Sequence, residues 1–179
     1  MMRSPTISRA VAVRLILEDH RLLLDRIEDM PEKRLYESVR IAEGSFGHFC
    51  ESLHDLMSHI LMWDEITLAV LTEAAHGRNH WSLDPRWETP SAGRALNLGG
   101  VHAGREVAAG LLKHRLHSVS AALVAELERY DEAAWTDPGT GGDFDGSIGA
   151  LAEYVATPPD GAPYGHVARH LIGETGIGS

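Results

Sequence analysis

Four stretches of the chain carry an apolar residue at every third or fourth position, and this spacing restricts the fold more than any other feature. A period near 3.6 residues aligns such side chains on one face of an α-helix. No stretch of comparable length alternates apolar and polar residues as a strand does. The sequence therefore predicts an all-α protein, with helices at 6–29, 45–75 and 104–130 and a last one in two pieces, 147–156 and 164–174.

Amphipathic helices of this length bury their apolar stripes against one another, which favours a four-helix bundle. The link between the second and third helices, residues 77–100, is rich in Gly, Pro and Trp and is long for antiparallel neighbours. We expect it to be a long crossover that passes over the end of the bundle and helps to form a mouth. A chain of 179 residues fits one domain, which we place at 1–179.

Charge and cysteine content limit the classes of partner and compartment. The formal net charge is −10, and Lys and Arg are scattered among acids, so we expect no nucleic-acid partner. The one cysteine, Cys50, cannot form an internal disulfide, and no apolar stretch approaches membrane-spanning length. Arg14 interrupts the apolar run near the N-terminus, which we interpret as a helix rather than a signal peptide. These features predict a cytoplasmic protein with no membrane partner, acting on a small-molecule substrate, and we expect a homodimer.

Eleven histidines are many for this length, and their helical faces separate them. At 100° per residue, His59 lies on the inner edge of the apolar stripe of 45–75, whereas His54 faces solvent. His166 and His170 are four residues apart and share a face of the last helix. Two imidazoles at this spacing can close on one cation, and a third from another helix would complete a facial set with open positions. Such a set is typical of catalytic zinc, and it also suits nickel or iron.

Simpler readings of these histidines stay open at this point. A pair at i, i+4 arises by chance, and the chain has a second one, His76 and His80, which straddles Gly77 where a helix is ending. His59 alone is more often a hydrogen-bonded histidine at the edge of a core than a ligand. Periodicity does not show that the three residues meet.

Several segments resemble the DinB/YfiT-like superfamily in order and spacing. LHDLMSHILMWDEITLAVL, residues 53–71, is similar to its second helix, and YGHVARHLIGE, residues 164–174, to its closing helix with a His-x-x-x-His pair. GALAEYVATPPDGAPYGH (149–166) and TPSAGRALNLG (89–99) resemble the ClbS/DfsB branch. The resemblance implies a four-helix bundle with a long crossover. It also implies a zinc or nickel ion held by His59, His166 and His170, although the ClbS/DfsB branch does not uniformly keep all three ligands.

The resemblance also implies a range of activities. Some members transfer or isomerise groups with a low-molecular-weight thiol such as mycothiol or bacillithiol, and others open a strained electrophile of a natural product as self-protection. We therefore predict a metal-dependent transferase, hydrolase or isomerase, with or without a thiol, that acts on a small electrophilic metabolite in secondary metabolism or detoxification. The alternatives are a non-catalytic small-molecule-binding resistance or stress protein on the same fold and a bare helical dimerisation module.

Four residues are candidates for contact with a substrate. His20 lies within the apolar stripe of the first helix and is either a general base or a hydrogen-bonded core histidine. Trp63, one turn beyond His59, is either a pocket wall or a core aromatic. Arg105, on the apolar stripe at the start of the third helix, either binds an anion or reaches out to solvent. Tyr164, at the start of the last segment, is the fourth. Glu174 would continue the face of the histidine pair and orient a ligand imidazole.

Overall fold

The computed structural model describes residues 3–171, and every regular element in this part of the chain is helical. The all-α prediction is confirmed. The helices are α1 (Arg9–Ile27), α2 (Glu32–Leu35), α3 (Leu53–Ala75), the short 3-10 helix η1 (Trp81–Leu83), α4 (Pro90–Arg105), α5 (Ala109–Glu128), α6 (Glu132–Thr136), α7 (Ile148–Ala156) and α8 (His166–Leu171).

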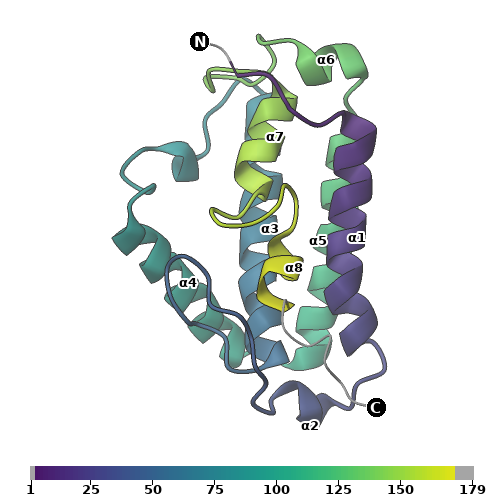
Figure 1. Ribbon diagram of the computed structural model, residues 1–179, viewed down its shortest axis with the longest axis vertical. Helices are drawn as coiled ribbons and strands as arrows, with labels where there is room; N and C mark the ends of the chain where they lie inside the picture. The colour runs from purple at the N-terminus through teal and green to yellow at the C-terminus, as the bar shows by residue number, and fades with distance from the viewer. Residues whose placement is uncertain (1–2, 172–179) are drawn as a thin grey trace.

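Three long helices, α1, α3 and α5, run side by side, and α7 and α8 follow one another along the same axis in front of α3 (Figure 1). α3 is the central element, because α4, α5 and α7 all pack against it. α8 packs against α1, so the two pieces of the last segment together fill the place beside α1 and α3. This arrangement brings the ends of the described chain, α1 and α8, into contact across the middle of the molecule.

The second helix begins later than the sequence predicts. It starts at Leu53, and residues 45–52 contain no helix. The hydroxyl of Ser52 accepts a hydrogen bond from the backbone N–H of Asp55, 3.1 Å away, and so caps the first turn. This capping hydrogen bond explains where the helix starts, although the apolar period extends further toward the N-terminus.

The crossover at residues 77–100 is not the loop that the sequence predicts, because it contains η1 and most of α4. Thr89 caps its N-terminus by accepting from the N–H of Ala92, and Pro90 fills the first position, which needs no donor. α4 lies diagonally against the lower half of α3 (Figure 1). Gly100 and Gly104 face Met62 and Ser58 of α3 so closely that a Cβ at either position would collide. The glycines that suggested a loop therefore permit a close helix–helix contact.

The third helix is also shorter than predicted, since it begins at Ala109 rather than near residue 104. The chain turns at residues 106–108, where the N–H of Val107 donates to the carbonyl of Gly104. Arg105 consequently belongs to the last turn of α4 and not to the first turn of α5.

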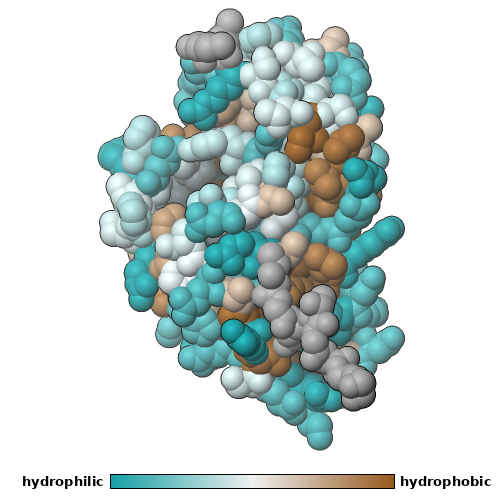
Figure 2. Space-filling model, in the orientation of Figure 1, coloured by the Kyte–Doolittle hydropathy of each residue, from teal (hydrophilic) through white to brown (hydrophobic). Residues whose placement is uncertain are grey.

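Two apolar clusters fill the interior. The first joins the C-terminal half of α1 to the N-terminal halves of α3 and α5, and its fully buried members include Leu23, Leu56 and Leu112. The second joins the opposite ends of these helices to α6 and α7, around Trp135 and Leu151. The face turned toward the viewer in Figure 2 is mostly hydrophilic, and its visible hydrophobic residues gather beside α1. Among residues 3–171, no helix combines the length and apolar character that crossing a bilayer requires.

Candidate metal centre

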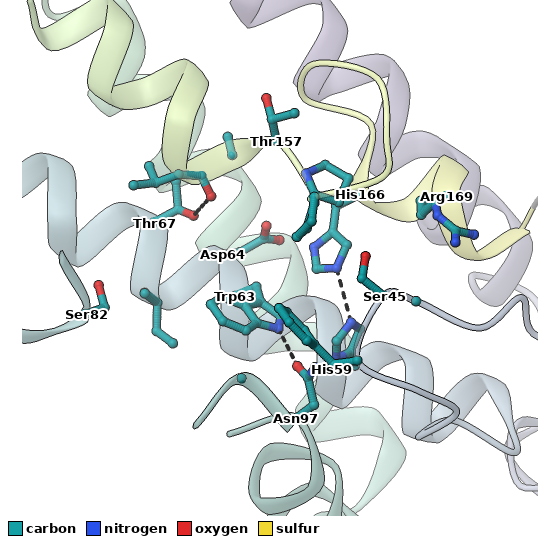
Figure 3. Close-up of a pocket in the computed structure, with 18 of the residues that line it drawn as sticks. Ser45, His59, Trp63, Asp64, Thr67, Ser82, Asn97, Thr157, His166 and Arg169 are labelled. Carbon is teal, nitrogen blue, oxygen red and sulfur yellow. Dashed lines mark hydrogen bonds between the residues drawn. The ribbon is translucent and has the colours of Figure 1, made fainter. Parts of the chain in front are cut away.

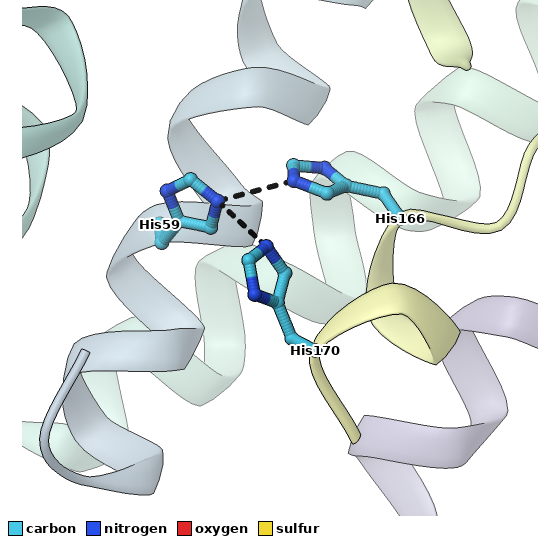
Figure 4. Close-up of side chains that lie close together, drawn as sticks. All are labelled: His59, His166 and His170. Carbon is cyan, nitrogen blue, oxygen red and sulfur yellow. Dashed lines mark hydrogen bonds between the residues drawn. The ribbon is translucent and has the colours of Figure 1, made fainter. Parts of the chain in front are cut away.

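Three histidines from two distant stretches of the chain meet inside the bundle. His59 lies in the middle of α3, and His166 and His170 lie at either end of α8 (Figure 4). The Nε2 atom of His59 is 3.1 Å from Nε2 of His166 and 3.2 Å from Nε2 of His170. All three ligand atoms lie within 4.8 Å of one another. His59 and His170 are buried, and His166 is half-buried.

The spacing of the nitrogens fits a shared cation. Imidazole nitrogens bind zinc at about 2.0–2.1 Å, and angles between 90° and 109° at the metal place neighbouring nitrogens about 2.8–3.4 Å apart. The two separations of 3.1 and 3.2 Å fall in this range. Facing nitrogen lone pairs repel one another unless a proton or a cation lies between them. The geometry of the three rings therefore suits a metal ion.

The hydrogen bond behind His170 fixes which of its nitrogens faces the centre. Its Nδ1 lies 2.9 Å from the backbone carbonyl of Ala42, and a carbonyl can only accept, so Nδ1 carries the proton. The Nε2 atom of a neutral His170 then presents its lone pair to the other two rings. A backbone carbonyl behind the ligating ring is a common support for histidine ligands.

The site keeps its imidazoles uncharged. Burial, reinforced by the repulsion that a protonated His170 would exert, lowers the pKa of His59 to about 3. Burial lowers the pKa of His166 further below its ordinary value, with the neighbouring histidines adding to the effect. Burial also lowers the pKa of His170, against the opposing effect of its hydrogen bond to Ala42. Neutral rings are the form that binds metal, so little proton release would oppose binding.

A carboxylate of α1 holds α8 in position. The backbone N–H groups of Val167 and Ala168 donate to the two oxygens of Asp19, each over 2.8 Å. These N–H groups belong to the first turn of α8 and have no acceptor within the helix, and a negative charge at that end of a helix is favourable. Tyr164, at φ 58°, makes the left-handed turn that leads into the helix. Asp19 thereby fixes the register of the element that carries two of the three histidines.

The three histidines line a cavity of about 320 Å³. Its wall is largely aromatic and apolar, and polar groups of the segment after α7 close one side (Figure 3). The aromatic residues of the lining are Phe46, Phe49, Trp63, Trp87 and Tyr154. Outside the triad, Ser45 and Asp160 hydrogen bond to one another and join two loops at the cavity. A volume of this size suits a small organic molecule.

Trp63 lies in the wall of this cavity, which is one of the two placements that the sequence left open. Its Nε1–H donates to Oδ1 of Asn97 over 2.7 Å, which fixes the indole against α4 (Figure 3). Asn97 itself was not predicted as a site residue, because residues 77–100 were interpreted as a loop. The spacing of Asn97, Val101 and Gly104 would place all three on one face of a helix, and this was the signal that could have identified Asn97.

The other three candidates for substrate contact are not in the lining. His20 is buried behind the wall, where Nε2 lies 3.1 Å from Asp64 and Nδ1 lies 2.6 Å from the hydroxyl of Ser120. Asp64 does line the cavity, although no sequence pattern pointed to it as a site residue. Tyr164 is packed in the second apolar cluster, and its hydroxyl has no hydrogen-bond partner among the described residues. Glu174 lies outside the described residues.

Arg105 belongs to a separate, smaller depression on the surface. Its guanidinium donates to both oxygens of Asp55, over 2.9 and 2.8 Å. The depression is lined by Tyr36, Ser38, Glu51, Ser52, His54, Asp55 and Arg105, none of which lines the larger cavity.

The prediction that His54 faces solvent is wrong. Its side chain is 1% exposed. The ring of Tyr36 stacks on it with centroids 4.4 Å apart, and its Nε2–H donates to the carbonyl of Val107 over 2.9 Å. The segments before α3 and after α4 cover a face of α3 that the apolar period marks as polar.

Comparison with known proteins identifies the fold. No protein-family model matches the chain, and no curated protein matches it in sequence. Two solved structures share its fold. One is the colibactin self-resistance protein ClbS in complex with double-stranded DNA, with a TM-score of 0.65 and 19% identity over 83% of this chain and 86% of that chain. The other is an uncharacterised protein from Escherichia coli UTI89, with a TM-score of 0.66 and 16% identity over 84% and 85%. The predicted resemblance to ClbS is confirmed at the level of fold.

The prediction that excluded a nucleic-acid partner is contradicted by this comparison, because ClbS, a protein of the same fold, was solved with double-stranded DNA. The prediction used net charge, which is a sum over the whole surface. A sum does not describe how charge is distributed over the one face that meets a ligand.

Proposed function

We propose that this protein is a metal-dependent enzyme that transforms a small electrophilic molecule in the cavity beside His59, His166 and His170. The observation that carries the proposal is the meeting of three Nε2 atoms at 3.1 and 3.2 Å in the wall of that cavity. Three imidazoles leave further coordination positions for a ligand, as catalytic zinc sites do. The donor set also suits nickel and iron.

The chemistry of such a centre is the activation of a nucleophile. A divalent ion held by three histidines lowers the pKa of a water or thiol bound to it toward neutrality. His170, backed by the carbonyl of Ala42, and His59, buried in α3, would hold the ion firmly. The aromatic wall, with Trp63 fixed by Asn97, would bind the apolar body of the substrate. These features support a transferase, hydrolase or isomerase, and a low-molecular-weight thiol is the co-substrate we propose for the transfer and isomerisation reactions.

The fold neighbour gives a second candidate function. ClbS is described as a self-resistance protein, and the apolar cavity of this chain would also suit a protein that sequesters a toxic metabolite without transforming it. Because ClbS was solved with double-stranded DNA, a duplex belongs among the ligands to be assayed. Metal content separates the two functions, since sequestration in the cavity needs no ion.

Elemental analysis of the purified protein tests the proposal first. We expect about one divalent ion per chain, and we expect His59→Ala and His170→Ala to lose it. His114→Ala is the matched control, because this exposed histidine of α5 lies outside the cavity. A wild-type protein that stays metal-free after incubation with zinc, nickel and iron(II), yet binds small apolar molecules, would overturn the enzyme and favour the sequestering protein.

A further inference from the structure

The wall of the cavity contains a buried acid–base pair that the proposed metal centre does not use. Asp64 of α3 and His20 of α1 face one another, with Oδ2 and Nε2 3.1 Å apart. Their side chains are 9% and 5% exposed. Asp64 lines the cavity together with the three histidines, and His20 lies behind it. Burying a carboxylate is costly, so its presence in the wall of a binding cavity calls for a function beyond packing.

Asp64 is close to the three histidines but separate from them. It follows His59 by five residues on the same helix, and it lines the cavity together with His59 and His166 (Figure 3). It is not a member of the group whose ligand atoms lie within 4.8 Å of one another. The carboxylate is therefore not one of the candidate metal ligands, although it lines the same cavity.

The partners of His20 hold the pair in a fixed orientation. Its Nδ1 lies 2.6 Å from the hydroxyl of Ser120 on α5, so the pair bridges α1, α3 and α5. Within the described residues, Oδ2 of Asp64 is buried and accepts no hydrogen bond, and its contact with Nε2 of His20 is an ion-pair distance of 3.1 Å. A carboxylate held from one side by an imidazole keeps its remaining lone pairs for another donor.

The charges around this pair come from three helices. Burial alone would lower the pKa of His20, but the hydrogen bond and charge of Asp64, followed by the charge of Asp19, outweigh burial and raise it. On the cavity side, His59 of α3 and His166 of α8 are the neighbouring titratable groups, and both are held neutral by burial. The carboxylate beside His20 therefore lies in the cavity wall next to two uncharged rings.

We propose that Asp64 is the proton acceptor of this cavity, which takes the proton of a nucleophile that carries an S–H or O–H bond. This inference rests on the proposed function and extends it. In the step, the S–H or O–H bond breaks and its electron pair stays on sulfur or oxygen. A new O–H bond forms on the Asp64 carboxylate, so the proton stays in the protein.

A thiol probe tests whether the proton stays in the protein when the thiol binds. The full-length protein is loaded with Co²⁺ and titrated with 2-mercaptoethanol, and binding is followed by the absorption band of sulfur coordination between about pH 6 and pH 8. If Asp64 accepts the proton, none is released to solvent, and the dissociation constant of the thiol does not change with pH. In Asp64→Asn the proton must be released to solvent. Linkage then makes the dissociation constant of the thiol fall about tenfold for each unit by which the pH rises.

Asp55→Asn is the matched control. Asp55 is a buried carboxylate of the same helix in an ion pair with Arg105, but it does not line the cavity. We expect this variant to keep the pH-independent affinity of the wild type.

Three results would overturn the inference. They are a wild-type dissociation constant that already falls about tenfold per pH unit, an Asp64→Asn variant that behaves like the wild type, and a cobalt-loaded protein that coordinates no thiol. The pH dependence of thiol binding to the wild type tests the inference even if Asp64→Asn does not fold. A protein that fails to bind Co²⁺ would instead overturn the proposed function, so the two failures are distinguishable.

Discussion

At the scale of single residues, the Asp55–Arg105 pair gives a prediction about pH. Burial raises the pKa of Asp55, but the hydrogen bond from Arg105 and the N–H of Glu51 outweigh burial, so the pKa is lowered from 3.8. The stabilisation is therefore fully present above the unfolded value and is lost as pH falls through the lower folded value. We expect Asp55→Asn to reduce the free energy of unfolding by about 1–3 kcal/mol at neutral pH.

Denaturant unfolding of both proteins at pH 7 and near pH 3 measures this difference. The gap between wild type and Asp55→Asn should be smaller at the acidic pH. An equal gap at both values would show that the charge of Asp55 does not contribute.

Local periodicity indicated the faces of the histidines but not what surrounds them. The helical face of His59 and the spacing of His166 and His170 were readable because both depend on local periodicity. Asp64 was not identified, because a carboxylate on a helix usually faces water and its buried partner, His20, lies 44 positions away. His54 was misplaced for the same reason, since Tyr36 covers it from a distant segment.

At the scale of elements, the long helices were predictable and the short ones depended on tertiary contacts. α1, α3 and α5 were expected from apolar periodicity, but they start three to eight residues later than predicted because caps and turns set where they begin. α4 was missed, since its glycines weaken a helical prediction although they are needed for packing on α3. α8 has six described residues, too few for a stable isolated helix, and it depends on Asp19.

The contact between α4 and α3 predicts opposite effects for two glycines of one helix. A Cβ at Gly104 would collide with Ser58, so we expect Gly104→Ala to destabilise the fold by about 1–3 kcal/mol. Nothing lies within 4 Å of a Cβ at Gly99, so Gly99→Ala should be neutral or stabilising by up to about 1 kcal/mol through helix propensity. Thermal unfolding of the two variants measures both effects, and equal destabilisation would contradict this packing.

The attachment of α8 predicts that a residue outside the cavity controls the metal site. Asp19→Asn removes the charge that holds the first turn of α8, so we expect the affinity for zinc to fall about tenfold. Competition with a chromophoric chelator measures this affinity. Asp25→Asn, at an exposed position of the same helix, is the control and should leave it unchanged. Full affinity in Asp19→Asn would show that α8 is positioned without this carboxylate.

At the scale of the whole molecule, α3 and α8 form the candidate centre, and α4 and the segments around it complete the cavity. The fold class and the order of the main helices followed from the sequence, and two solved structures share the fold. The meeting of residue 59 with residues 166 and 170 did not follow from periodicity, because it depends on how α8 packs beside α1 and α3. Only the three-dimensional arrangement brings those rings to 3.1 and 3.2 Å.

A shared ion would therefore link distant parts of the chain and stabilise the whole fold. An ion that binds only the folded state stabilises it by about 4 kcal/mol at a thousand times its dissociation constant. We expect added zinc to raise the melting temperature of the metal-free wild type and not that of His59→Ala. Calorimetry with and without zinc measures this shift, and an equal shift in both proteins would place the zinc elsewhere.

X-ray absorption spectroscopy of the zinc-loaded protein tests the central claim most directly, because it reports the atoms bound to the ion. The proposed centre predicts three imidazole nitrogens at about 2.0–2.1 Å together with at least one further light atom. Coordination by one or two imidazoles, or by sulfur from Cys50, would contradict a centre formed by His59, His166 and His170.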